Sequence, residues 1–222
     1  MSQSETLMAR DGHTFGAYIA KPPGKARGGI VVVQEIFGVA PHVRRVADDY
    51  AAQGYLAVAP SLFDRVARGI VLGYSPAEVE QGLGYRKQIP TPKAVLDIAA
   101  AAAICRHAGR VAVLGFCWGG RLAWAAASEV PLGAAVIYYG GGIPEELPKA
   151  PHCPTILHFG TRDKSIPASD IEQLRAALPT GEFHLYDAGH AFNNDDRPQS
   201  FDAAASALAR ERTLAFLAQR LG

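Results

Sequence analysis

Short apolar runs rich in β-branched residues alternate with helix-like segments along most of the sequence, and this alternation constrains the fold more than any other feature. Gly29–Val33 (GIVVV) and Tyr55–Ala59 (YLAVA) are typical of strands buried on both faces. Between them, Pro41 suits the first turn of a helix and Gly54 suits the position just after its end. These segments predict a strand–helix–strand unit in an α/β fold, with a mostly parallel sheet and helices on both faces.

The alternation continues to the end of the chain, with one irregular stretch. We expect further strands at 110–114, 134–139, 155–160 and 182–187, and helices at 92–107, 118–129, 168–178 and 199–221. Residues 62–89 show no clean period, and we expect them to cross the carboxyl ends of the strands, where open α/β sheets bind ligands. Because the 222 residues contain no repeat or linker, we expect a single domain over residues 1–222.

Charge and composition exclude several classes of function. The 22 Lys and Arg residues nearly balance the 21 Asp and Glu residues, so we expect neither nucleic acid nor a membrane as a partner. Three cysteines without a CxxC pair argue against a disulfide framework or a thiolate zinc site, and the histidines lack metal-ligand spacing. The first ten residues have no apolar leader segment. We therefore expect a cytoplasmic protein that requires no metal and no cofactor.

The segment Gly115–Gly120 (GFCWGG) carries the most specific chemical signal. It follows an apolar strand and precedes a helix, which is the setting of the G-x-S-x-G nucleophile turn, here with cysteine in place of serine. Such a turn strains the nucleophile's backbone, and only small residues fit at Gly115 and Gly119 where strand and helix meet. The alternative interpretation of Cys117 is a buried structural cysteine in a glycine-rich turn.

Two later residues favour the catalytic interpretation. In the fold that uses this turn, the acid follows the nucleophile and the base comes last, each after a strand. Asp163 follows the strand expected at 155–160, and His190 follows the one expected at 182–187. Alone, Asp163 would be read as a turn residue and His190 as a capping or solvated residue. Their joint placement indicates a catalytic triad with Cys117.

A carboxylate follows the first buried strand, in the sequence QEIFG that begins at Gln34. Glu35 either caps the next helix or faces Cys117. The backbone amides of this loop and of the residue after the nucleophile are the expected donors to a reaction oxyanion. We therefore predict the amides of Ile36 and Trp118 as the oxyanion hole.

These motifs resemble the dienelactone hydrolase family of the α/β-hydrolase fold, over nearly the whole chain. The matching segments are DGHTFGAYIA at Asp11, VVQEIFGV at Val32, QGYLAVAPSLF at Gln53, GFCWGG at Gly115, AVIYYGGG at Ala135, AGHAF at Ala188 and ERTLAFL at Glu211. The resemblance implies that Cys117 is the nucleophile, His190 the base and Asp163 the residue that orients it. It also implies that Glu35 associates with the resting thiol and takes its proton when substrate displaces it.

The resemblance is weaker at the substrate pocket. It implies substrate contacts for Phe37, Tyr138 and Tyr85, but the two arginines with which the family holds a substrate carboxylate have no clear counterparts. Asn194 stands where one of them is expected. Because a neutral amide binds a carboxylate more weakly than an arginine does, we expect a reduced preference for carboxylate-bearing substrates. The arginines that could supply the missing charge are Arg65, Arg68, Arg86 and Arg197.

Together these features predict a cysteine-dependent hydrolase of small esters or lactones, with lactones from aromatic degradation as one candidate class. Its expected partner is a small-molecule substrate, and its expected state is a monomer or a weak homo-oligomer. The alternative is a non-catalytic member of the fold in which Cys117 serves as a redox-sensing or ligand-binding thiol.

Overall fold

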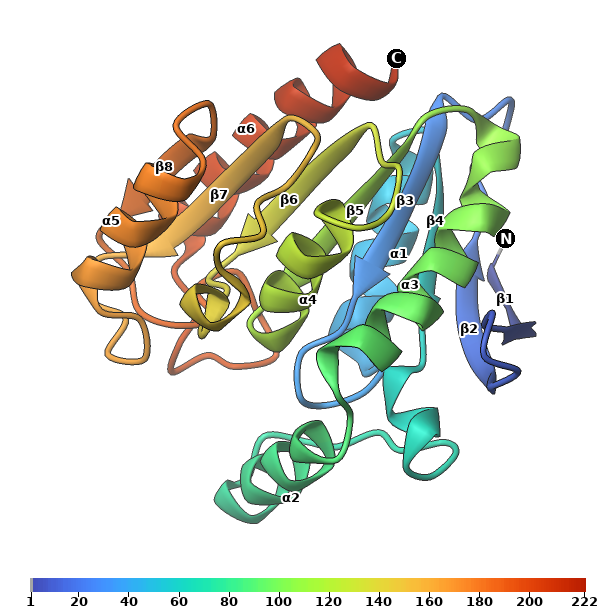
Figure 1. Cartoon of the computed structure of the whole chain (residues 1–222), viewed down its shortest axis with the longest axis horizontal. Helices are drawn as coiled ribbons and strands as arrows, with labels where there is room; N and C mark the ends of the chain where they lie inside the picture. Colours follow the sequence, from blue (N-terminus) through green and yellow to red (C-terminus); the bar gives the residue numbers. More distant parts are fainter. Residues whose placement is uncertain (1) are drawn as a thin grey trace.

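The computed structural model describes residues 2–222 and contains one sheet of eight strands in the order β1-β2-β4-β3-β5-β6-β7-β8 (Figure 1). The strands are β1 (Ser2–Met8), β2 (Thr14–Ala20), β3 (Gly28–Val33), β4 (Tyr55–Pro60), β5 (Val111–Phe116), β6 (Ala134–Tyr138), β7 (Thr155–Gly160) and β8 (Glu182–Tyr186). β1 pairs antiparallel with β2, and β2 antiparallel with β4. All pairs from β4 to β8 are parallel, as the sequence predicts.

Helices cover both faces of the sheet. The helices are α1 (Pro41–Ala52), α2 (Pro76–Lys87), α3 (Thr91–Cys105), α4 (Trp118–Ala127), α5 (Ala168–Ala177) and α6 (Ala203–Leu221). α1 and α6 lie on one face and α3 and α4 on the other, while α2 projects beyond the carboxyl ends of the strands (Figure 1). Within residues 2–222, no helix combines the length and the apolar character needed to cross a membrane.

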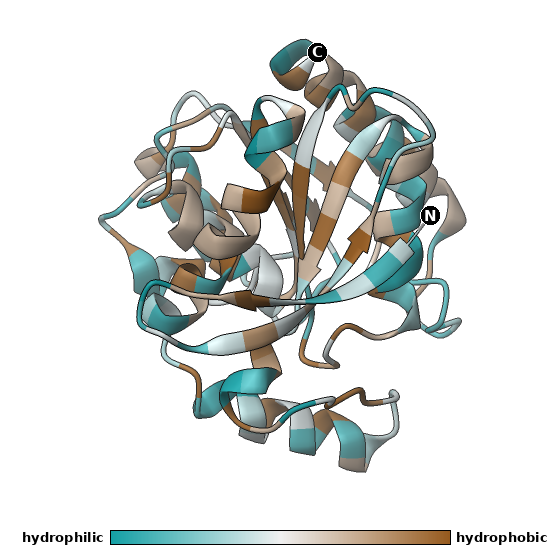
Figure 2. Cartoon of the chain, turned by 90° about the vertical axis from the view of Figure 1, so that its right-hand side faces the viewer, coloured by the Kyte–Doolittle hydropathy of each residue, from teal (hydrophilic) through white to brown (hydrophobic). Residues whose placement is uncertain are grey.

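The central strands form the core because both of their faces are covered. Every residue of β3, β5 and β7 is buried, and apolar colouring concentrates on the strands while polar colouring lies on outer helix faces and loops (Figure 2). Continuous apolar runs such as Gly28–Val33 fit this setting, because a strand buried on two sides has no solvent face. Gly54 adopts a φ of +95° just after α1, which confirms its predicted role at the end of that helix.

The structure differs from the sequence prediction in three places. The β1–β2 hairpin was not predicted, and the stretch 62–89, expected to be irregular, contains α2 and a short 3-10 helix at Leu62–Arg65. The start of α2 has a capping box, in which Ser75 and Glu78 bond each other's backbone N–H groups, so a local signal was present. The last helix begins at Ala203 rather than near Gln199, with Asp202 as its N-cap.

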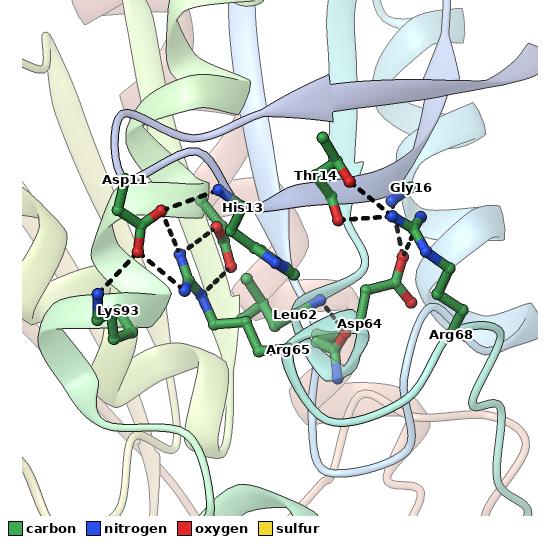
Figure 3. Close-up of polar contacts among 11 residues, drawn as sticks. Asp11, His13, Thr14, Gly16, Leu62, Asp64, Arg65, Arg68 and Lys93 are labelled. Atoms are coloured by element: carbon green, nitrogen blue, oxygen red, sulfur yellow. Dashed lines mark hydrogen bonds and ion pairs between the residues drawn. The ribbon is translucent and has the colours of Figure 1, made fainter.

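An ion cluster attaches the N-terminal hairpin to the rest of the fold (Figure 3). The guanidinium of Arg65 donates two hydrogen bonds of 2.7 Å to the fully buried carboxylate of Asp97 on α3. Arg65 also binds Asp11 at 3.1 Å, and Lys93 binds the same Asp11 carboxylate at 2.9 Å. Asp11 lies in the turn between β1 and β2, so this cluster connects the edge hairpin with α3 and with the segment that leads towards α2.

Candidate active site

Cys117 occupies a sharp turn between β5 and α4. Its backbone has φ 54° and ψ −118°, a region that L-residues rarely adopt and that costs about 1–3 kcal/mol. A Cβ atom on Gly115 would lie 1.9 Å from the carbonyl oxygen of Gly119, and one on Gly119 would lie 2.4 Å from that of Val33. Only glycine fits at these two positions. The geometry is therefore that of a strand–turn–helix nucleophile turn, with the Cys117 side chain half-buried at the carboxyl end of the sheet.

His190 and Asp163 lie on the loops that follow β8 and β7. The ring nitrogen Nδ1 of His190 is 2.6 Å from Oδ2 of Asp163, whose carboxylate is fully buried. The other carboxylate oxygen accepts a 2.8 Å hydrogen bond from the amide of Ser165. Asp163 is thus fixed from two sides, and it holds the His190 ring in one orientation.

The protonation of His190 depends on its two neighbours. Burial lowers its pKa, but hydrogen bonds with Asp163 and Cys117 outweigh that effect and raise the pKa to about 10. The structure therefore brings all three predicted triad residues together, with His190 between the thiol and the carboxylate. The raised pKa favours the imidazolium form of His190 at neutral pH.

Glu35 is buried near the same residues. One of its carboxylate oxygens accepts a 2.9 Å hydrogen bond from Asn194, while the other, Oε1, is buried and has no hydrogen-bond partner within residues 2–222. Burial, followed by the charges of Glu35 and Cys117, raises the pKa of Tyr139 well above its ordinary value. Glu35 and Cys117 therefore both act on one tyrosine ring. Of the two interpretations of Glu35, its burial near Cys117 favours the one in which it faces the site.

The setting of Asn194 in the structure differs from that of the substrate contact expected from the sequence. It is fully buried, and its amide nitrogen donates to Glu35 and, at 3.2 Å, to the hydroxyl of Tyr74. Its amide oxygen accepts a bond from the backbone of Asp196 at 3.1 Å. Because the amide is already occupied by protein partners, Asn194 positions Glu35 rather than offering a free group to substrate.

The predicted oxyanion donors are the backbone amides of Ile36 and Trp118. Within residues 2–222, neither amide donates a hydrogen bond to a protein acceptor. Trp118 is the first residue of α4, where a helix leaves its amides unpaired. The carbonyl of Ile36 contacts α2 so closely that a Cβ on Gly82 would lie 2.1 Å from its oxygen. α2 therefore supports the loop that carries Ile36.

The three predicted aromatic contacts have different settings. Phe37 packs edge-on against Tyr74, with ring centroids 4.7 Å apart. Tyr85 on α2 packs against Phe63, which in turn stacks on Trp118 beside the nucleophile. The hydroxyl of Tyr138, by contrast, shares a 2.8 Å hydrogen bond with Thr213 of α6 in the core. This places the polar end of Tyr138 on the α6 side of the sheet.

Tyr139, which sequence reasoning did not single out, contacts the triad instead. Its ring packs edge-on against His190 with centroids 4.9 Å apart, and its hydroxyl donates to Asn193. Tyr139 follows the end of β6 with a left-handed backbone (φ 38°), and its ring lies 6.1 Å from that of Tyr138, with both rings packed on Phe116 and Phe192. Strand alternation therefore does not place Tyr139 against His190, and the sequence carries no local signal for this contact.

Within residues 2–222, three clefts border these residues, and one of them, of about 350 Å³, is lined by Tyr138 and Asn193. His190 and Asp163 border a cleft of about 490 Å³ that extends to residues 199–202. Trp118 borders another of about 450 Å³, together with Leu83 and Arg86 of α2. Within the part of the chain that the structure describes, no three His, Cys, Asp or Glu side chains are grouped as a metal site.

The strand order, the strained turn at Cys117 and the positions of Asp163 and His190 are those of an α/β-hydrolase. Residues 15–221 match the dienelactone hydrolase family. The chain belongs to this family.

Individual relatives extend over nearly the full length of the chain. It is 34% identical to a carboxymethylenebutenolidase of Pseudomonas putida, with 98% of this chain and 97% of the relative covered. It is 32% identical to carboxymethylenebutenolidase 1 of Cupriavidus pinatubonensis at the same coverage. A solved structure from Klebsiella pneumoniae, provisionally described as a dienelactone hydrolase, is 31% identical with a TM-score of 0.85 and 99% coverage of both chains. The chain is thus a carboxymethylenebutenolidase-like hydrolase.

Proposed function

We propose that this hydrolase cleaves small esters or lactones through a covalent intermediate on Cys117, with His190 as acid and base and Asp163 as its orienting partner. The observation that carries the proposal is the position of His190, which bonds Asp163 at 2.6 Å and whose pKa is raised by both Asp163 and Cys117. Relatives that are carboxymethylenebutenolidases support a butenolide as the substrate.

In the first half-reaction, the Cys117 thiolate attacks the carbonyl carbon and forms a carbon–sulfur bond. The carbonyl π electrons move to the oxygen, where the amides of Ile36 and Trp118 stabilise the charge. One such donor contributes about 2.7–4 kcal/mol in comparable sites. When the tetrahedral intermediate collapses, the bond to the alkoxide breaks and His190 protonates that oxygen, leaving a thioester on Cys117.

In the second half-reaction, neutral His190 takes a proton from water as the water attacks the thioester. The carbon–sulfur bond breaks, the acid product leaves, and the sulfur departs as a thiolate beside the imidazolium. Before the first half-reaction, we propose that Glu35 associates with the resting Cys117 thiol and takes its proton through the unpartnered oxygen Oε1 when substrate displaces it. Asn194 would keep the other oxygen of this carboxylate in place.

Replacement of Cys117 by alanine tests the proposal. We expect Cys117→Ala to lose hydrolysis of 4-nitrophenyl acetate, and Cys117→Ser to be much slower than wild type because a hydroxyl ionises far less readily. Cys153→Ala is the matched control, since burial raises the pKa of Cys153 to about 11 and keeps it a thiol at neutral pH. Turnover that persists undiminished in folded Cys117→Ala would contradict the assignment of the nucleophile.

A further inference from the structure

Arg197 lies on the loop between β8 and α6, over two aromatic rings of the candidate site. Its guanidinium carbon is 5.7 Å from the ring centroid of Phe37 and 5.5 Å from that of Tyr74. Cation–π contacts of this kind hold a guanidinium in place without neutralising it. Phe37 directly follows Ile36, the proposed oxyanion donor, and Tyr74 bonds Asn194 beside Glu35.

The charge of Arg197 has no anionic partner in the described part of the chain. The two nearest acids in sequence, Asp195 and Asp196, both bind Arg45, at 2.8 and 2.7 Å. The Nε of Arg197 is buried without any hydrogen bond within residues 2–222. A buried donor without an acceptor is unfavourable, so an acceptor that reached the Nε of Arg197 would be stabilised there.

The other arginines that could supply a charge are differently placed. Arg65 is bound by Asp97 and Asp11, and Arg68 donates to the side chain of Thr14 at 2.7 Å (Figure 3). Both belong to the ion cluster at the N-terminal hairpin. Arg86 lies on α2, in the cleft bordered by Trp118.

Arg197 also acts on the groups around the nucleophile. Burial raises the pKa of Tyr139, the charges of Glu35 and Cys117 raise it further, and the charge of Arg197 opposes them. The guanidinium is therefore within electrostatic reach of the ring that packs on His190.

We propose that Arg197 binds a carboxylate of the substrate and sets the preference of this enzyme for acid-bearing over neutral lactones and esters. This inference rests on the proposed function of Cys117. It replaces the expectation that Asn194 leaves the pocket without a carboxylate ligand, because the charge is supplied from a position three residues further along the chain. Its planar guanidinium can form two parallel bonds to a carboxylate, which a neutral amide cannot match.

The test compares a carboxymethylene-substituted butenolide with its methyl ester. We expect wild type to have a higher kcat/KM for the free acid, and Arg197→Gln to reduce the acid-to-ester ratio about 10- to 150-fold. Arg197→Lys should retain part of the ratio through its charge. Arg86→Gln is the matched control and should leave the ratio unchanged. Three outcomes would overturn the proposal. The first is an acid-to-ester ratio of kcat/KM near one in wild type, and the second is an unchanged ratio in Arg197→Gln. The third is a fall of this ratio in Arg86→Gln.

A binding measurement separates this inference from the proposed chemistry. Calorimetric titration of Cys117→Ala with the free acid, and of the double variant Cys117→Ala/Arg197→Gln, needs no turnover. We expect the dissociation constant to rise about 10- to 150-fold in the double variant. If Cys117 proves dispensable for hydrolysis but this rise is observed, the nucleophile assignment fails and the role of Arg197 stands. Equal dissociation constants would refute the role of Arg197 whatever the outcome for Cys117.

Discussion

Asp163→Asn tests the electrostatics of the candidate site, because it keeps the size of the side chain and removes its charge. Burial lowers the pKa of His190, yet hydrogen bonds with Asp163 and Cys117 bring it to about 10 from an ordinary value of 6.5. That difference corresponds to a net preference for the imidazolium of about 5 kcal/mol. The 2.6 Å bond to a fully buried carboxylate is the shortest polar contact of His190. Without its charge, we expect the pKa of His190 to fall.

The variant should lose catalysis on the scale known for removal of a triad carboxylate charge, about 10³- to 10⁴-fold in kcat/KM. The assay is hydrolysis of 4-nitrophenyl acetate as a function of pH, with circular dichroism to verify that the variant is folded. Asp170→Asn is the control, because Asp170 is a partly buried aspartate in the first turn of α5, outside the candidate site. Less than a tenfold loss in folded Asp163→Asn would refute the claim that this carboxylate activates the base.

The same ion pair predicts how stability depends on pH. The folded protein keeps the His190 proton up to about pH 10, whereas the unfolded chain releases it near 6.5. The stabilisation is therefore fully present below pH 6.5 and is lost as the pH rises through about 10. In urea titrations at about pH 6, 8 and 10, the unfolding free energy of wild type should decline by up to about 5 kcal/mol more than that of Asp163→Asn. Parallel declines would show that the pair contributes nothing to stability.

Two further predictions concern the surroundings of the site. Asp97→Asn removes the buried charge that Arg65 binds with two 2.7 Å bonds, so urea unfolding should show a loss of about 3 kcal/mol; a loss below about 1 kcal/mol would contradict this. Gly82→Ala places a Cβ 2.1 Å from the carbonyl oxygen of Ile36, which should cost about 1–3 kcal/mol of stability and lower kcat/KM by displacing the loop that carries Ile36, a proposed oxyanion donor. Gly84→Ala on the same helix is the control, since no atom lies within 4 Å of the added Cβ. Equal effects of the two substitutions would argue against a role for the contact between Gly82 and the Ile36 carbonyl.

The parts of the fold that sequence predicted well are those governed by local pattern. Strands such as Gly28–Val33 are recognisable because burial on both faces demands an unbroken apolar run. The β1 strand, Ser2–Met8, was missed because most of its residues are exposed and its pairing with β2 gives no strong apolar period. α2 was missed for a similar reason: its only buried residue is Gly82, so its helical face carries little hydrophobic signal.

The candidate site likewise contains some residues that sequence predicts and some contacts that it does not. Sequence predicted the positions of Cys117, Asp163 and His190, because each follows an expected strand and the order of strands along the chain can be read from the sequence. The bond between Asn194 and Glu35 joins loops 159 positions apart, and no pattern in either loop indicates it. The setting of Arg197 likewise depends on how its loop folds over Phe37 and Tyr74. Such contacts are set by tertiary packing rather than by local propensity.

The reactive groups lie far apart along the chain, with Cys117 after β5 and His190 after β8. During synthesis, Cys117 leaves the ribosome some seventy residues before His190, its proposed base. A nascent chain in which β8 has not yet paired with β7 holds Cys117 without its base and without Asp163 locked by His190. Under the proposed mechanism, the reactivity of Cys117 is therefore coupled to completion of the sheet edge. Partly made or truncated chains would carry this thiol without the base that the mechanism assigns to it.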